Sequence, residues 1–181
     1  MKRLLAAAGI GLVPMLTMTL LPPGVAVAGT ATKVTLFPVG DGNQLETHTW
    51  VECNLPITTC NFTAGVQLRT PDGVEGFGDK LWARQSTEVR SSNRSAYLDV
   101  HADGGPETKV FKEGGNAVIT TIYQGAGPPE KYQTNGLIDV NEWATGQPKT
   151  DANVIVCAHV QVVYPGVNLT TPATCAIAKF S

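Results

Sequence analysis

Apolar and polar residues alternate along several segments of this chain with a period of two. The longest segment is Asn153–Tyr164, in which the even positions are valine, alanine or tyrosine, and the odd positions include Cys157, His159 and Gln161. One apolar face and one mixed face are typical of a long, half-buried β-strand in an antiparallel sheet. Pro165-Gly166 then predicts that the chain reverses, and a last strand follows.

The same alternation recurs upstream and is interrupted by turn signals such as Thr70-Pro71-Asp72-Gly73. No stretch of about a dozen residues shows helical periodicity. The other expected strands are Thr32–Phe37, Thr47–Leu55, Cys60–Arg69, Leu81–Arg90, Ser95–His101, Thr108–Lys112, Val118–Tyr123, Leu137–Val140 and Ala173–Phe180.

Roughly eight to ten short strands separated by Gly- and Pro-rich turns favour an all-β fold. The composition agrees, because threonine, valine, glycine and proline are abundant while leucine, lysine and glutamate are scarce. We predict an antiparallel β-sandwich of immunoglobulin-like type, formed by residues 29–181 as a single domain. A closed β-barrel is the alternative.

The N-terminal residues have the order of a secretory signal peptide. Lys2 and Arg3 precede an uncharged apolar stretch, Leu4–Leu21, and Ala26-Val27-Ala28 supplies the small residues that signal peptidase requires. We predict cleavage between Ala28 and Gly29, which leaves no stable membrane insertion. The alternative is an uncleaved anchor, since the apolar run is about long enough to span a bilayer.

The charge of the remaining chain argues against one class of partner. All 15 acidic residues lie in residues 29–181, and two of the 13 basic residues are Lys2 and Arg3, so the net charge there is near −4. Nucleic-acid binding needs clustered Lys and Arg, which this segment lacks. We therefore expect a secreted or envelope-associated protein that does not bind nucleic acid.

Four cysteines in an exported chain predict two disulfides. We favour Cys53–Cys60, which closes a short loop, and Cys157–Cys175, because these two cysteines are equidistant from Gly166. An immunoglobulin-type bridge between the sheets would instead join Cys60 to Cys157, with Trp82 packed on it, and Cys53 to Cys175. The spacing does not match a zinc site.

No common catalytic motif is present: the chain lacks G-x-S-x-G, H-E-x-x-H, a P-loop and G-x-G-x-x-G. We therefore expect a non-catalytic protein. One alternative is a secreted hydrolase whose dispersed site would use His101 or His159 with Asp99 or Asp103. Another is an inhibitor that presents the disulfide-braced loop Asn54–Thr59.

We expect neither a metal nor a cofactor. The three histidines, including His48, fall on three different expected strands. The segment Asp99–Gly105 places oxygen ligands at alternate positions before a glycine, as calcium loops do, but its middle ligand is His101. The position at which a bidentate glutamate would close an EF-hand loop is Val110.

Two aromatic residues are candidate binding residues. Tyr132 and Trp143 lie in a region rich in glycine and proline, in which Tyr132 follows Gly125–Pro129. Aromatic side chains exposed on loops can stack on sugar rings or anchor a protein partner. We therefore predict that Tyr132 and Trp143 bind a carbohydrate or protein partner.

The chain as a whole resembles the small exported β-proteins of unknown function found in actinobacteria. The likeness rests on the Ala/Val-rich signal peptide, the Thr/Val/Gly/Pro-rich domain and the two cysteine pairs. It implies no activity and no catalytic residues. The sequence thus predicts a secreted, non-catalytic β-sandwich that binds a partner or ligand outside the cytoplasm.

Overall fold

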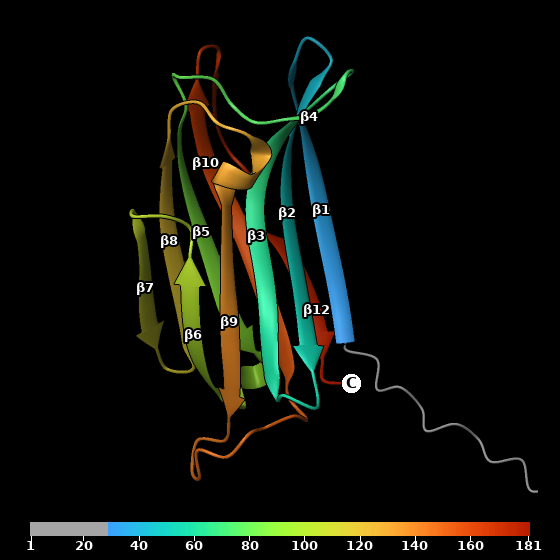
Figure 1. Cartoon of the computed structure of the whole chain (residues 1–181), viewed down its shortest axis with the longest axis vertical. Helices are drawn as coiled ribbons and strands as arrows, with labels where there is room; N and C mark the ends of the chain where they lie inside the picture. The colour runs from blue at the N-terminus through green and yellow to red at the C-terminus, as the bar shows by residue number, and fades with distance from the viewer. Residues whose placement is uncertain (1–28) are drawn as a thin grey trace, which may run out of the picture.

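The computed structural model describes residues 29–181 (Figure 1). The predicted signal peptide, residues 1–28, lies outside the described residues. Apart from two short 3₁₀ turns, η1 (Ser92–Arg94) and η2 (Pro129–Tyr132), all regular structure there is β-strand. No helix within residues 29–181 has the length and apolarity needed to cross a membrane.

Twelve strands form two antiparallel sheets that pack face to face, so the predicted β-sandwich is confirmed and a single closed barrel is not formed. The first sheet has the order β1-β2-β3-β9-β6, with β4 added to β3. Its strands are β1 (Gly29–Gly40), β2 (Asn43–Asn54), β3 (Thr59–Thr70), β4 (Gly73–Glu75), β6 (Tyr97–Asp103) and β9 (Gln133–Asn141).

The second sheet has the order β11-β10-β5-β8-β7, with β12 paired to β10. Its strands are β5 (Trp82–Ser91), β7 (Thr108–Glu113), β8 (Asn116–Gln124), β10 (Asn153–Tyr164), β11 (Val167–Thr170) and β12 (Thr174–Lys179). The bounds of β10 are those predicted from its alternation. The sequence reasoning missed β4 and β11, since three or four residues are too few to show a period of two.

Both predicted disulfides are present, and both join directly opposite residues of neighbouring strands. Cys53–Cys60 links β2 to β3 inside the core, whereas Cys157–Cys175 links β10 to β12 on the outer face of the second sheet. The immunoglobulin-type bridge between Cys60 and Cys157 does not form. Two structural disulfides are typical of proteins in an oxidising, extracellular environment.

The core consists of two apolar clusters. The disulfide-end cluster lies near the lower end in Figure 1 and includes Val51, Cys53, Cys60, Phe62, Val89, Leu98, Ile119, Ile138, Val140, Val154 and Val156. The loop-end cluster lies near the upper end and contains Leu45, Val66, Phe77, Leu81, Ala83, Tyr123, Tyr132, Val160 and Val162.

A belt of buried polar side chains separates the two clusters along four strands. On β5, for example, Gln85 and Thr87 lie between Ala83 of one cluster and Val89 of the other. The Gln85 amide donates to the Ala64 carbonyl over 3.1 Å. The members of this polar belt are Thr47, Thr49, Gln85, Thr87, Thr121 and Thr134.

Candidate ligand-binding site

The loop end of the sandwich is closed by two connecting segments that run side by side in antiparallel directions. Residues 76–81, between β4 and β5, lie against residues 125–128, between β8 and η2. The Gly127 amide donates to the Phe77 carbonyl over 3.1 Å, and the Gly125 amide donates to the Leu81 carbonyl over 2.9 Å. A side chain at Gly76 would collide with the Gly127 carbonyl, so this close approach of the two segments requires glycine at this position.

Four aromatic rings pack together beneath these two segments. Phe77 contacts Tyr132 edge-on, with ring centroids 4.9 Å apart, and Tyr164 at 5.8 Å. Tyr132 also meets Tyr123 edge-on at 5.9 Å. Such edge-to-face pairs contribute about 0.5–1.5 kcal/mol each beyond the area that they bury. The rings therefore fix the position of Phe77, which forms one wall of a cavity.

The cavity has a volume of about 370 Å³ and opens beside the segment 76–81. This volume lies within the range of small-molecule sites, which is roughly 300–1,000 Å³. Its walls are mainly apolar, and Gly78, Asp79 and Lys80 form part of the mouth. The apolar lining residues are Leu68, Phe77, Leu81, Tyr164 and Pro165.

Tyr164 is the polar group within this apolar lining. The hydroxyl is protonated at neutral pH, as tyrosine ordinarily is, and burial raises its pKa further. Within residues 29–181 this hydroxyl makes no hydrogen bond, and burial is the sole cause of its pKa shift, so it is available to donate to a ligand. Asp79 and Lys80 at the mouth are exposed and carry opposite charges. The arrangement suits a largely apolar ligand with one hydrogen-bond acceptor.

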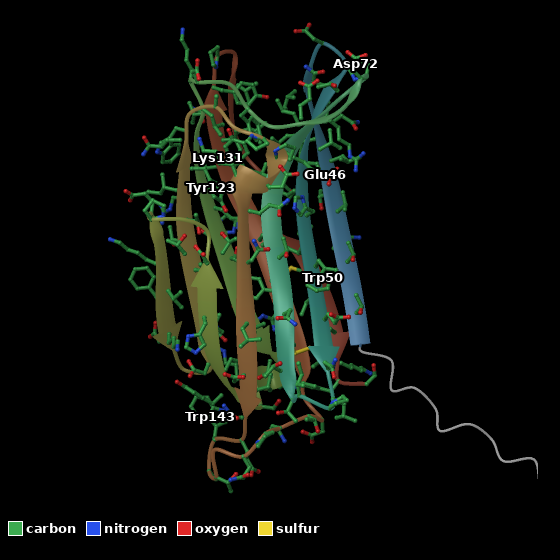
Figure 2. All side chains as sticks on the ribbon, in the orientation of Figure 1. Glu46, Trp50, Asp72, Tyr123, Lys131 and Trp143 are labelled. Atoms are coloured by element: carbon green, nitrogen blue, oxygen red, sulfur yellow. A yellow bond between two sulfur atoms is a disulfide. The ribbon has the colours of Figure 1, made fainter. Side chains whose placement is uncertain are left out.

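The candidate binding residues Tyr132 and Trp143 do not form a common platform, which corrects the sequence-based expectation. Tyr132 is 0% exposed, and its hydroxyl donates to the Gly125 carbonyl over 2.8 Å. It therefore packs beneath the loop that carries it. Figure 2 shows Trp143 at the opposite end of the molecule from Tyr123 and Lys131, the residue before Tyr132.

Trp143 is 52% exposed and is held against its own chain. Its ring meets Tyr97 edge-on at 5.4 Å, and its indole Nε1 donates to the Arg94 carbonyl over 3.3 Å. One part of the ring covers Gly115, where an added Cβ would lie 2.8 Å from it. Trp143 thus leaves an exposed aromatic surface, remote from the cavity.

The disulfide-braced loop at the other end of the sandwich presents apolar side chains. Leu55 and Ile57, between Cys53 and Cys60, are 44% and 57% exposed. The Thr58 amide donates to the Leu55 carbonyl over 3.3 Å, which closes a tight turn. The bridge and this turn hold the apolar tip in one conformation.

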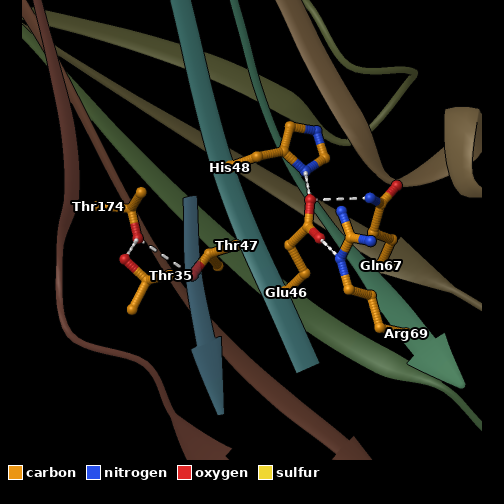
Figure 3. A network of polar contacts seen from close by, with 7 residues as sticks. All are labelled: Thr35, Glu46, Thr47, His48, Gln67, Arg69 and Thr174. Carbon is orange, nitrogen blue, oxygen red and sulfur yellow. Dashed lines mark hydrogen bonds and ion pairs between the residues drawn. The ribbon is translucent and has the colours of Figure 1, made fainter. Parts of the chain in front are cut away.

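A buried carboxylate lies on the outer face of the first sheet (Figure 3). Glu46 is only 3% exposed, because Arg69 forms an ion pair with it and the Gln67 amide donates to it over 2.9 Å. The His48 Nδ1 lies 3.6 Å from the same carboxylate. The side chains of Glu46, Gln67 and Arg69 therefore link β2 to β3.

Burial lowers the pKa of His48, although the Glu46 carboxylate opposes this effect. Its ring covers Gly65, where an added Cβ would lie 2.8 Å from Nε2.

A separate set of threonine contacts, also drawn in Figure 3, lies between the two sheets. The Thr174 hydroxyl oxygen is 2.8 Å from that of Thr35 and 3.1 Å from that of Thr47. Both networks connect strands rather than line a cavity.

The register of β6 and β9 brings together three potential metal ligands. Asp99 lies directly opposite Asp139, and His101 follows on the same face of β6. One ligand atom from each residue lies within 4.8 Å of the other two. The Lys112 ammonium forms an ion pair with Asp99 and lowers the pKa of this carboxyl group. A metal ion would therefore have to displace Lys112.

The residues considered for a dispersed hydrolase site are not brought together. His159 projects from the outer face of the second sheet, where it lies opposite Ser86, whereas His101 lies on the first sheet. Asp103 accepts a hydrogen bond from the Gly105 amide over 3.0 Å and so forms a turn. His101 has its Nε2 3.7 Å from an Asp99 carboxylate oxygen and lies beside Asp103 on the same strand. His159 is on the other sheet, so the four residues do not form one site.

Sequence reasoning missed the cavity and the contribution of Asp139. The cavity is lined by residues from β3, the β4–β5 connection and the β10–β11 turn, so no local pattern identifies it. Asp139 joins the other ligands only through the pairing of β9 with β6.

No protein-family model matches this chain, and no curated protein sequence matches it.

Proposed function

We propose that this chain is an exported, non-catalytic binding protein that takes a small, largely apolar ligand into the cavity at the loop end of the sandwich. The observation that carries the proposal is the apolar cavity of about 370 Å³ beside residues 76–81. The Tyr164 hydroxyl would orient the ligand, while Leu68, Phe77 and Leu81 would contact its apolar part.

Titration with N-phenyl-1-naphthylamine, a neutral apolar fluorophore, tests the proposal. We expect a saturable rise in fluorescence at one site per chain. Leu68→Glu places a charge in a partly exposed wall, and burial of that charge by the probe is costly, so affinity should fall by at least about tenfold. Tyr164→Phe retains the ring and should weaken only ligands that accept a hydrogen bond.

The matched control is Ile177→Glu, which places the same charge at an exposed position on the outer face of β12. It should leave probe affinity unchanged. Circular dichroism and melting curves establish that both variants fold. Equal affinity in Leu68→Glu and wild type, or equal loss in both glutamate variants, would refute binding in the cavity.

Export is part of the same proposal. Its support is the signal-like order of residues 1–28 and the two disulfides of the folded domain. Intact mass and N-terminal sequencing of the secreted protein should give Gly29 as the first residue. A protein that retains residues 1–28 in the membrane fraction would contradict cleavage after Ala28.

The braced loop supports a second candidate function, as an inhibitor. Leu55 and Ile57 are exposed on a turn that Cys53–Cys60 closes, so little conformational entropy remains to be lost on binding. Residual activity of a panel of extracellular proteases, measured with wild type and with Ile57→Asp, tests this candidate. Inhibition by wild type alone would favour it, and no inhibition by either protein would exclude protease inhibition for that panel.

A further inference from the structure

β7 is an edge strand whose outer face carries one large apolar side chain, Phe111, between Lys109 and Glu113. It pairs only with β8, and its other side has no neighbouring strand in the described part of the chain. Phe111, at its centre, is 59% exposed and is the most exposed large apolar side chain among residues 29–181. Open edges with apolar side chains are templates for pairing with another strand.

The hairpin geometry shows which backbone groups face this open side. Gly114 and Gly115 connect β7 to β8, and both have positive φ, of 54° and 83°, as a type I′ turn requires. Such a turn closes on a hydrogen-bonded pair, here Glu113 with Asn116. Because pairs alternate along an antiparallel ladder, the backbone groups of Val110 and Lys112 point away from β8.

We propose that two copies of this chain form a symmetric dimer by antiparallel pairing of their β7 strands, centred on Phe111. In this register Val110 of one copy forms hydrogen bonds with Lys112 of the other, and Phe111 faces Phe111. Lys109 lies opposite Glu113 of the second copy, and Glu113 opposite Lys109. The strand is therefore complementary to itself in charge, as a two-fold interface requires.

Other registers are less favourable. A shift of one residue would place groups that point toward β8 opposite groups that point outward, so the hydrogen bonds could not form. The next allowed register in one direction places Lys112 opposite Lys112, and like charges directly opposite each other are destabilising. In the other direction Lys109 lies opposite Phe111, and both charge pairs are lost.

The side chain of Lys112 does not obstruct this pairing. Its ammonium forms an ion pair with Asp99 of its own chain, on the side of β7 opposite to Phe111 and Lys109. The residues that would meet across the dimer, Lys109, Phe111 and Glu113, all project from the outer face of the second sheet. The cavity beside residues 76–81 has no β7 residue in its lining.

Sedimentation equilibrium of the folded domain, residues 29–181 with both disulfides formed, tests the dimer. We expect a concentration-dependent equilibrium between monomer and dimer. Phe111→Thr keeps a good strand-forming residue but removes the aromatic pair, and should raise the dimer dissociation constant by at least about tenfold. Ile177→Thr, the same kind of substitution at an exposed position on β12, should leave it unchanged.

Charge reversal provides a sharper test. K109E should weaken the dimer because the introduced carboxylate faces Glu113 of the second copy, and E113K should weaken it because two ammonium groups then face each other. A mixture of K109E and E113K restores both attractive pairs, so a heterodimer should form with an affinity close to that of wild type. The double variant K109E/E113K should also dimerise.

Three results would overturn the proposal. They are a wild-type protein that stays monomeric at every concentration, a dimer that is indifferent to Phe111→Thr, and single charge variants that fail to recover on mixing. Melting curves of each variant exclude unfolding as the reason for a lost dimer.

Discussion

The two ends of the core are filled by different kinds of side chain. The disulfide-end cluster consists largely of valine and alanine with some isoleucine and leucine, and Phe62 and the Cys53–Cys60 bridge lie among them. The loop-end cluster contains three of the four packed aromatic rings and has a cavity at its border. One end of the core is thus filled mainly by aliphatic side chains and a disulfide, whereas the aromatic end borders a cavity.

The polar belt explains how one sandwich accommodates both ends. Hydrogen bonds such as Thr121–Thr134, at 2.9 Å, and Tyr123–Thr134, at 2.8 Å, join β8 to β9 across the two sheets. Because a buried polar group that loses its partner costs about 1–3 kcal/mol, these contacts resist sliding of the sheets. A change at the loop end should therefore disturb the disulfide end little.

Replacing one phenylalanine in each cluster should break this comparison most strongly. Phe62→Ala should lower the free energy of unfolding by about 3–5 kcal/mol, because the ring is fully buried against Gly136. Phe77→Ala should cost less, since this ring already borders a cavity, but should abolish probe binding. Urea midpoints and fluorophore titration measure the two effects. A loss of probe binding in folded Phe62→Ala would show that the ends are coupled.

Removing the outer disulfide should have the next largest effect. Changing both Cys157 and Cys175 to Ala should lower the free energy of unfolding by about 2–4 kcal/mol, since the bridge restricts the unfolded chain around the terminal hairpin. Probe affinity should not change, because the bridge lies on the outer face of the second sheet. Urea unfolding under non-reducing conditions measures the stability, and an unchanged midpoint would contradict the prediction.

Alkaline pH should act on the loop end. Burial raises the pKa of Tyr123 to about 12, so between about pH 10 and pH 12 the native state binds more protons than the unfolded state. Stability should therefore fall as the pH rises above about 10, by an amount on the order of 2 kcal/mol. Tyr123→Phe should reduce this loss but not remove it, because burial also raises the pKa of Tyr132 and Tyr164. Equal alkaline slopes in both proteins would contradict the assignment.

The strands and bridges could be predicted from the sequence because their signals are local. The alternation in Asn153–Tyr164 defines β10, and the symmetric spacing of Cys157 and Cys175 about Gly166 follows from hairpin geometry. The cavity could not be predicted, because Leu68, Phe77 and Tyr164 meet only after the sheets pack. The burial of Tyr132 could not be predicted either, since it depends on Phe77, which is distant in sequence, packing against its ring.

Mild acid should have a smaller effect, on the outer face of the first sheet. Burial lowers the pKa of His48, so the unfolded state binds more protons as the pH falls below about 6.5. The contribution of His48 to the free energy of unfolding is fully present above that pH. It is lost as the pH falls through the lowered pKa of the native state. His48→Asn should remove this component of the slope. The contribution of Asp99, whose pKa is also lowered, disappears only at lower pH, which separates the two groups.

Divalent metal should have the smallest effect of all. A metal ion present at 100 times its dissociation constant would stabilise the native state by about 2.7 kcal/mol, which shifts the Tm of a domain of this size by several degrees. The Lys112 ammonium already neutralises Asp99, so melting curves in EDTA, calcium or zinc should agree within about a degree.

A variant sharpens this test. Lys112→Ala removes the competing charge and leaves Asp99, His101 and Asp139 close together. In that variant zinc should raise the Tm, and Lys112→Ala/Asp139→Asn should not respond. A zinc shift in the wild-type protein would show that the metal displaces Lys112 and that this face of the first sheet is a metal site.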